Sequence, residues 1–565
     1  MGLDHISPID REQLHQLLAL HPELGSLLGV AGKEGLLPEL TTEARLATLA
    51  TLCRWRDARA ELEQAPREQT QRDFDLDQRI FAASIELARY VEEDLRWWEY
   101  DPNLPRGLAA LFARDLAEAR QHDVAWETLR VRLEELPGCL ASAQGAMSAA
   151  DDLLRAAAIE DCAALGSLVE FIIGEATSAA DAGHLTQHVA GSIARSAVGA
   201  RDALDRRYAW LKGLPTSTER WRIGEEHFNA LLHHRALDIS VADLADLSAS
   251  VVEQLRLEER RIANRLFRKR EAAGALPLAR TQEPHYFEEA LSWSEELVAQ
   301  SRIFLDEAQA FPVANTTSLT VLPAPAGFAP DLDDGMLLEA PRFAPERGSF
   351  LLLHAPPQAE LGRRSVADLE NMVAAHALPG ALLFSAVTRE RTSLLRSGAP
   401  LGLLGGPGSL WALETSAGWR FHAEELMREL LFRDSPASRL VAARRGLYRA
   451  LLARIELGLH TRGLRLDQAK ALLLEVGGAS EERASRDLTT CMRSPTRALS
   501  ELLGRLRLQQ LRREAKLYWR DRYADRTLHE LVLSGGPMPL TYHFELLDDP
   551  PSYTIDDSDE QHAAL

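Results

Sequence analysis

Residues 240–255 read SVADLADLSASVVEQL, and this stretch shows the pattern that decides the fold. Its first residue, Ser240, and Asp243 form a capping-box pattern, in which each side chain can bond to a backbone amide at the start of a helix. Similar patterns fill residues 1–310 and return after residue 365, so the sequence predicts a mostly α, large multi-helix protein. The apolar residues of the stretch recur at the three- or four-residue steps of one helix face: Leu244, Leu247, Val251 and Leu255.

The segment from residue 311 to 364 differs from the rest because it is rich in proline. It holds two short apolar runs, Leu319–Leu322 and Phe350–Leu353, each bounded by helix-breaking residues and therefore predicted to be a strand. Two strands in a helical protein favour a small antiparallel β-sheet, which we expect beside a central cleft. The predicted division is an N-terminal helical part (1–310), the Pro-rich segment (311–364), a C-terminal helical part (365–547) and an acidic tail (548–565).

Prolines and glycines within the helical parts predict where helices end. Pro137, Pro215 and the run Gly274–Pro277 are the expected breaks, because proline lacks an amide proton and clashes with the preceding helical turn.

Composition excludes several classes of protein. The chain has 565 residues and a formal net charge of −20, and an acidic surface repels phosphate backbones, so we expect no nucleic-acid partner. The four cysteines are isolated and form no C-x-x-C pair, which fits a reducing compartment. The first residues lack a basic start followed by an apolar run, and no apolar run approaches the roughly 18 residues of a membrane helix. The sequence therefore predicts a cytoplasmic protein with no membrane partner.

Several segments spread along the chain resemble one known family. They are His21–Gly29, Arg132–Pro137, Pro495–Gly504 and Leu528–Leu540, in that order. Their order and spacing resemble the bacterial family called domain of unknown function 885, whose members look like zinc metallopeptidases. The resemblance implies a helical scaffold built around a zinc-dependent hydrolase site.

The central motif of that family is present here only as a frame. The family motif reads His-Glu-x-x-Pro-Gly-His, and its Pro-Gly matches Pro379-Gly380. This alignment places Ala375 at the first His, His376 at the Glu and Ala381 at the second His. A catalytic zinc needs about three protein ligands and an open position for water, and an alanine methyl group can supply neither a ligand nor a base. The resemblance therefore predicts that no zinc is bound at this motif.

Two further family segments are partly retained. The family pattern Glu-Gly-Trp-x-x-Tyr-x-Glu has Ala417 in place of the first Glu and keeps Trp419 and Glu424. The pattern Asp-x-Gly-Leu-His has Glu456 in place of the Asp and keeps His460. One carboxylate of the family site is therefore lost, while other polar side chains survive.

The first hypothesis for function is a pseudo-peptidase, which binds a peptide-like small ligand or a protein without hydrolysing it. The vestigial cleft candidates are His376, Glu424 and His460. Trp419 and Arg512 are the predicted ligand-binding residues, since a guanidinium group can hold a peptide carboxylate through two parallel hydrogen bonds.

Two alternatives remain open at this point. The first is a peptidase with a rearranged zinc site, in which the three cleft candidates and His422 hold the metal. The second is a structural subunit, either in an oligomer or paired with an active relative.

Overall fold

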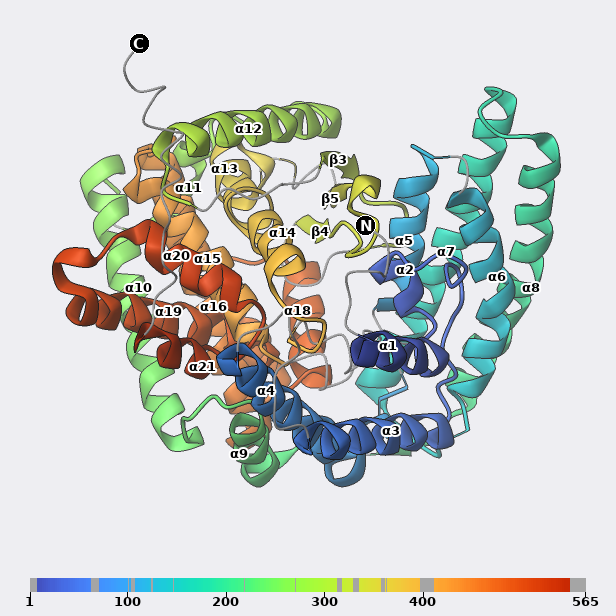
Figure 1. The fold of residues 1–565 in the computed structure, drawn as a ribbon. Coiled ribbons are helices and arrows are strands. Elements are labelled where there is room, and N and C mark those ends of the chain that lie inside the picture. The colour runs from blue at the N-terminus through green and yellow to red at the C-terminus, as the bar shows by residue number, and fades with distance from the viewer. Residues whose placement is uncertain are drawn as a thin grey trace, which may run out of the picture.

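The computed structural model describes residues 8–61, 71–99, 101–102, 107–122, 125–145, 147–217, 219–269, 271–311, 318–328, 335–356, 361, 363–396 and 411–548. Helices dominate this part of the chain (Figure 1), which confirms the predicted mostly α class. The α-helices are α1 (Pro8–Leu20), α2 (Leu24–Leu28), α3 (Thr42–Ala60), α4 (Gln71–Arg89), α5 (Gly107–Ala119), α6 (Ala125–Ser142), α7 (Asp152–Asp181), α8 (Gln187–Gly213), α9 (Gly224–His234), α10 (Val241–Phe267), α11 (Ala272–Ala279), α12 (Phe287–Ala308), α13 (Val366–His376), α14 (Ala381–Arg391), α15 (Leu413–Glu429), α16 (Pro436–Thr461), α17 (Leu466–Glu475), α18 (Glu481–Arg493), α19 (Arg497–Trp519), α20 (Asp525–Gly535) and α21 (Leu540–Glu545). The strands are β1 (Ala150–Asp151), β2 (Thr216–Ser217), β3 (Leu319–Pro323), β4 (Gly335–Leu338) and β5 (Ser349–Leu353).

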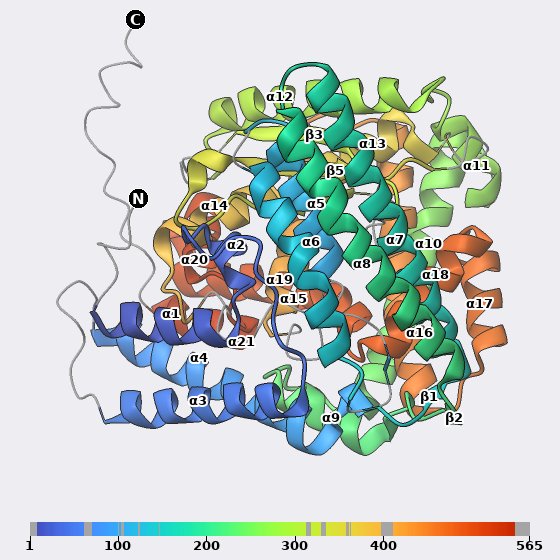
Figure 2. The ribbon, with the colours of Figure 1, turned by 90° about the vertical axis from the view of Figure 1, so that its right-hand side faces the viewer.

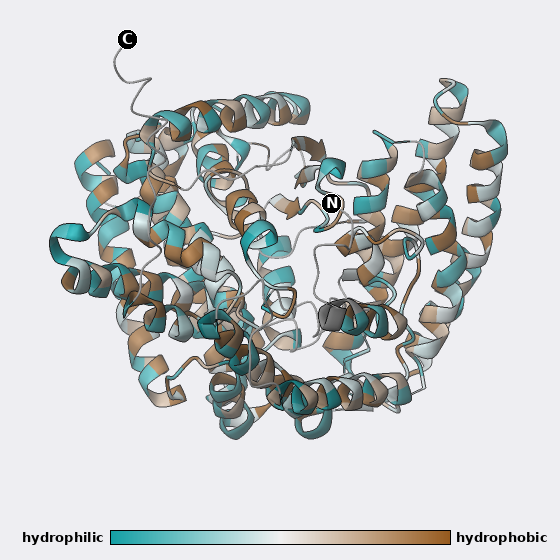
Figure 3. Cartoon of the chain, viewed as in Figure 1, coloured by the Kyte–Doolittle hydropathy of each residue, from teal (hydrophilic) through white to brown (hydrophobic). Residues whose placement is uncertain are grey.

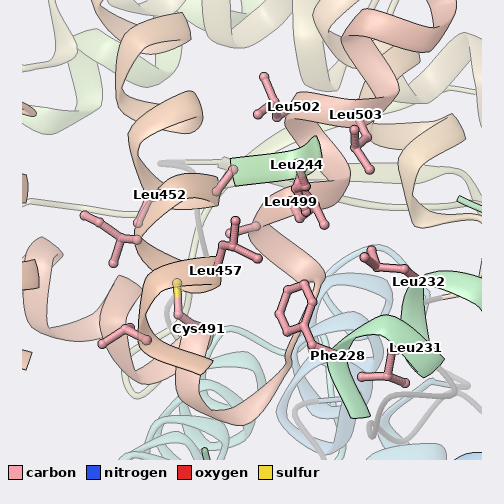
Figure 4. Close-up of a cluster of buried hydrophobic side chains, with 14 of the residues drawn as sticks. Phe228, Leu231, Leu232, Leu244, Leu452, Leu457, Cys491, Leu499, Leu502 and Leu503 are labelled. Carbon is pink, nitrogen blue, oxygen red and sulfur yellow. The ribbon is translucent and has the colours of Figure 1, made fainter. Parts of the chain in front are cut away.

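Helix α10 starts as its sequence predicts. The Ser240 hydroxyl accepts from the amide of Asp243 at 3.1 Å and donates to the Asp243 carboxylate at 2.6 Å. The apolar face that follows packs into a large hydrophobic cluster, where Leu244 lies with residues of α16 and α19 (Figure 4). Helix α10 is thus fixed at its start by the cap and along its length by this buried face.

Two of the predicted helix breaks are wrong. Pro137 lies inside α6 and Pro277 lies inside α11. In α6, Leu133 and Leu140 are buried on either side of the proline, so the burial of this face outweighs the lost hydrogen bond. The break predicted at Pro215 is confirmed, because α8 ends at Gly213 and β2 follows.

The two predicted strands are confirmed as β3 and β5, but they pair in parallel rather than antiparallel. The antiparallel neighbour of β5 is β4, whose four residues were not recognised in the sequence. The chain passes through β4 between β3 and β5, and the sheet order is β3-β5-β4. All three strands lie within the predicted Pro-rich segment, whereas the division into domains and the cleft stay predictions. The predicted acidic tail lies outside the described residues except for Asp548.

The three-stranded sheet is covered on both faces, which explains why all five residues of β5 are buried. Phe350 and Leu352 cluster with alanines of α5. Leu351 and Leu353 point to the opposite face and cluster with residues of α12 and α13. Figures 1 and 2 show α12 and α13 on one side of the strands and α5 on the other. The sheet therefore holds α13, the helix that leads into the family-like motif.

The outer helices have buried residues along one stripe of their surface. Along α12, hydrophilic and hydrophobic residues are mixed (Figure 3), and the buried positions Ala290, Leu297 and Val298 recur at helical spacing. Such helices cover the core on one side and meet solvent on the other.

One stretch is long and apolar enough to span a membrane by length and composition alone, whereas the sequence analysis expected no such stretch. It lies within residues Val366–Arg391, and 89% of its 18 most apolar consecutive residues are buried inside the protein. The stretch comprises α13, the motif turn and α14, so its apolar character matches the interior of the fold that surrounds it.

Candidate functional site

The family-like motif forms a tight turn between two buried helices. Helix α13 ends at His376, and α14 begins at Ala381. A Cβ atom added at Gly380 would lie 1.9 Å from the backbone oxygen of Ala375, so only glycine fits this close approach. The turn brings the backbone of two altered motif positions, Ala375 and Ala381, close together.

Trp419 of α15 holds this turn from the side. Its indole N–H donates to the carbonyl oxygens of Pro379, at 2.9 Å, and of Gly380, at 3.2 Å. The side chain is completely buried, and its only polar atom is used by the turn. Trp419 therefore supports the motif turn, and its predicted role in ligand binding stays a prediction.

The altered positions provide apolar surface where the family pattern has ligands. Ala375 and Ala417 are both buried, and Ala381 is partly buried. Among the described residues, no group of three or more His, Cys, Asp or Glu side chains is placed to hold a metal ion. The donor set therefore does not fit a catalytic zinc at the motif.

A buried histidine pair lies next to Trp419. The Nε2 atoms of His422 and His529 are 3.0 Å apart, and Nδ1 of His529 is 2.7 Å from the carbonyl oxygen of Ala310. A carbonyl can only accept, so Nδ1 of His529 carries the proton and its Nε2 accepts from His422. Phe311 stacks on the His529 ring at a centroid distance of 4.8 Å. The pair is thus neutral and enclosed by aromatic rings.

His529 belongs to the family-like segment Leu528–Leu540, but its sequence pattern does not mark it as a candidate site residue. Burial lowers the pKa of His529 to about 4, and burial together with the neighbouring His529 lowers the pKa of His422 well below its usual value. The sequence feature that could have pointed to this residue is its place in the family-like run Leu528-His529-Glu530. Its partner comes from α15, more than one hundred residues earlier, so no local pattern reveals the contact.

The cleft candidate Glu424 is held by two arginines of α16. Its Oε1 accepts from Arg445 and from Arg449, at 3.1 Å in both cases. Arg449 also contacts Glu501 at 3.1 Å. These arginines were not singled out in the sequence, where they resemble the charged residues of any amphipathic helix. The family-like carboxylate therefore belongs to a buried ion network.

The cleft candidate His460 lies in the large hydrophobic cluster. Its Nε2 is 2.9 Å from the carbonyl oxygen of Cys491, and its ring meets Trp221 edge-on at a centroid distance of 5.6 Å. Burial lowers its pKa to about 4. The third candidate, His376, is buried at the end of α13. His376, Glu424 and His460 therefore lie in different surroundings and are not grouped as metal ligands.

Arg512, a predicted ligand-binding residue, has protein carboxylates as partners. Its guanidinium group binds both oxygens of Asp525, at 3.1 and 3.2 Å, and it reaches Glu429 at 2.9 Å. Two protein carboxylates thus bind this guanidinium group, and its predicted contact with a peptide carboxylate stays a prediction.

The other family-like segments contact one another across the fold. Arg132 donates to the hydroxyl of Ser26 at 2.7 Å, which joins the first two segments. Glu456 accepts from the backbone amides of Ala498 and Leu499, at 3.1 and 3.0 Å, at the start of α19. A carboxylate at this place satisfies amides that lack helical partners. The retained pieces of the family pattern thus connect the scaffold.

The comparisons agree with this arrangement of segments. The model of domain of unknown function 885, described as a bacterial protein of unknown function, matches residues 22–543. The chain belongs to this family. A search of curated proteins finds no match.

Two solved structures share the fold of this family member. One is a provisionally named lipoprotein of unknown function from Shewanella oneidensis, with a TM-score of 0.69, 15% identity, and coverage of 96% of this chain and 99% of that chain. The other is a provisionally named lipoprotein from Colwellia psychrerythraea, with a TM-score of 0.73, 15% identity, and coverage of 94% and 98%. At this identity the likeness shows the fold alone.

The histidine pair predicts a pH-dependent contribution to stability. The pKa of His529 is about 4 in the folded state and about 6.5 when unfolded. Between these pH values the unfolded chain therefore binds a proton at His529, whereas the folded chain does not. The contribution is present above pH 6.5 and is lost as the pH falls towards 4. Between pH 7 and pH 5 this amounts to about 2 kcal/mol.

Urea unfolding of wild type and of the variant His529→Asn at both pH values measures this difference. Between pH 7 and pH 5, the free energy of unfolding of wild type should fall by about 2 kcal/mol more than that of the variant. Contributions from carboxyl groups are the same in both proteins and cancel in the comparison. The exposed His188 provides a control, because His188→Asn should follow the wild-type pH dependence. Equal pH dependence in all three proteins would contradict the prediction.

Proposed function

We propose that this member of the family is a pseudo-peptidase, which keeps the helical scaffold and binds a peptide-like ligand or a protein without zinc-dependent hydrolysis. The observation that carries the proposal is the loss of ligand atoms at Ala375, Ala381 and Ala417. An alanine side chain can neither bind zinc nor take a proton from water bound to a metal.

The contacts of the retained Trp419, and of Glu456 in place of the family's Asp, support this proposal. Trp419 supports the Pro379-Gly380 turn through two hydrogen bonds, and Glu456 holds the start of α19. These residues serve the fold, so they can persist in a protein without metal chemistry. The set of His376, Glu424, His422 and His460 does not form one group, and this disfavours the rearranged zinc site.

The place of this protein in the cell bears on its ligand. Both solved neighbours carry provisional lipoprotein names, so they lend no support to the cytoplasmic location predicted from the sequence. Pairing with an active relative, or self-association, likewise stays a prediction.

Zinc analysis of the purified protein tests the proposal. After dialysis against zinc and then against buffer, we expect a metal content well below one ion per chain and no chelator-sensitive cleavage of small peptides. A relative with the intact His-Glu-x-x-Pro-Gly-His motif, treated in parallel, should retain zinc. One tightly bound zinc per chain in the present protein would overturn the proposal.

A further inference from the structure

A cluster of polar and charged side chains lies where the end of β4 meets α14 (Figure 1). Glu339 directly follows β4, and its Oε2 accepts from the hydroxyl group of Ser385 at 2.8 Å. Along α14, Ala381, Ser385 and Arg389 recur at steps of four residues, so they follow one stripe of the helix. The cluster therefore continues the helix face that starts at the altered motif position Ala381.

Glu339 is open to solvent, although protein lies close around it. Its side chain is exposed, yet burial raises the pKa of its carboxyl group. Both observations fit a side chain on the wall of a concave part of the surface, where water reaches the carboxylate but solvates it incompletely. Ser385 orients one carboxylate oxygen, and the backbone carbonyl of Glu339 accepts from Arg114. Glu339 is thus held in place while its carboxylate stays accessible to a ligand.

Two arginines near Glu339 have no carboxylate bound to them. Within the described ranges of the chain, the guanidinium group of Arg389 has neither a hydrogen bond nor an ion pair. Arg342 donates to the backbone carbonyl of Thr392, but in the same part of the chain it binds no carboxylate. Burial lowers the pKa of both arginines, and the charge of Arg389 helps to lower the pKa of Arg342 to about 10. Two like charges therefore lie in partly dry surroundings without a direct counter-ion.

The other charges of this region are already paired. Arg114 binds Glu118 at 2.7 Å, and Arg347 binds the same carboxylate. The charge of Glu339 acts on Arg389, but no ion pair joins these two among the residues that the structure describes. A carboxylate and two guanidinium groups are thus left to bind a ligand with charges of both signs.

We infer that Glu339, Arg389 and Arg342 form a binding site for a zwitterion, and that its occupant is a short peptide with free ends. The ammonium group of the peptide binds Glu339, and its carboxylate binds the guanidinium groups, which match a carboxylate with paired hydrogen bonds. A short peptide carries both charges at neutral pH. This inference rests on the proposed function for the peptide-like nature of the ligand.

Calorimetric titration at neutral pH tests the inference with three dipeptides. They are alanyl-alanine, its N-acetyl form, which lacks the ammonium group, and its C-terminal amide, which lacks the carboxylate. We expect alanyl-alanine to bind and each capped form to bind at least about tenfold more weakly, since each has lost one charge-assisted contact. This comparison uses wild type alone and does not depend on the folding of any variant.

Two variants assign each end of the dipeptide to its partner. In Glu339→Gln, the difference in affinity between alanyl-alanine and its N-acetyl form should shrink to about threefold or less, while the amide still binds more weakly. In Arg389→Gln, the difference between the free acid and the amide should shrink in the same way. Both variants should fold, because the amide oxygen of Glu339→Gln can still accept from Ser385 and Arg389→Gln breaks no bond of the described chain.

The matched controls are Glu170→Gln and Arg201→Gln, which remove the same charges from an exposed ion pair between α7 and α8. Both should bind the three dipeptides like wild type. No binding of alanyl-alanine at millimolar concentration, equal binding of the three dipeptides, or unchanged discrimination in either site variant would overturn the inference. Binding of inorganic phosphate without binding of any dipeptide would overturn the peptide as the occupant. Zinc content is measured separately, so a zinc-free protein that binds no dipeptide contradicts this inference and leaves the loss of zinc-dependent hydrolysis standing.

Discussion

Replacing Gly504 by alanine is expected to lower the free energy of unfolding by about 3 kcal/mol, because it inserts a methyl group into a helix crossing that has no room for it. A Cβ atom at Gly504 would lie 2.0 Å from the backbone oxygen of Glu414 and 2.8 Å from the Cα atom of Gly418. All of these atoms belong to backbone, so the two helices α15 and α19 would have to move apart. The gain in helix propensity from glycine to alanine, about 1 kcal/mol, is too small to offset this.

The matched control is Gly174, which lies inside α7, two turns before its end, is exposed and would have nothing within 4 Å of an added Cβ atom. Gly174→Ala should stabilise the protein by about 0.5–1 kcal/mol. Denaturant unfolding followed by circular dichroism at neutral pH measures both variants. If Gly504→Ala were as stable as Gly174→Ala, the two helices would not cross as closely as described.

The helix crossing also matters for the site, because α15 carries several of its residues. Ala417 and Trp419 flank Gly418, and Glu424 lies two turns further along the same helix. A shift of α15 would move Trp419 away from the motif turn and Glu424 away from its arginines. A loss of ligand binding in Gly504→Ala would therefore accompany its loss of stability.

Much of the fold could be predicted from local pattern. The face of α10 and its serine cap are local features, and both were correctly predicted. Pro137 was misjudged because burial of leucines on both sides of it depends on helices far away in the sequence. The parallel pairing of β3 with β5 was missed because it depends on β4, a strand of four residues with little pattern of its own.

The site was harder to predict than the fold. The sequence located the motif turn and the loss of ligand atoms, since both are changes of residue type at fixed spacing. It could not place the arginines around Glu424 or the partner of His422, because these contacts join segments between 21 and 107 residues apart. Arg512 was expected to hold a ligand, but Asp525 and Glu429 bind it from neighbouring elements. Residue types thus suggested the chemistry, whereas the partners required the fold.

Trp419→Phe is expected to lower the free energy of unfolding by about 1–3 kcal/mol more than a matched change at Trp221. The change removes the indole N–H that binds two buried carbonyl oxygens, Pro379 and Gly380, and leaving buried acceptors without a donor costs about this amount. Trp221 is equally buried, and among the described residues its indole N–H has no acceptor. Trp221→Phe therefore removes similar volume without breaking such a bond.

Urea unfolding of the two variants at neutral pH gives the difference directly. If Trp419 is a support for the turn, Trp419→Phe should unfold at a lower urea concentration than Trp221→Phe, because only the first change leaves two buried carbonyl oxygens without their donor. Equal losses of stability in the two variants would contradict the support role and leave ligand binding, which the family resemblance first suggested, as the role to test for Trp419.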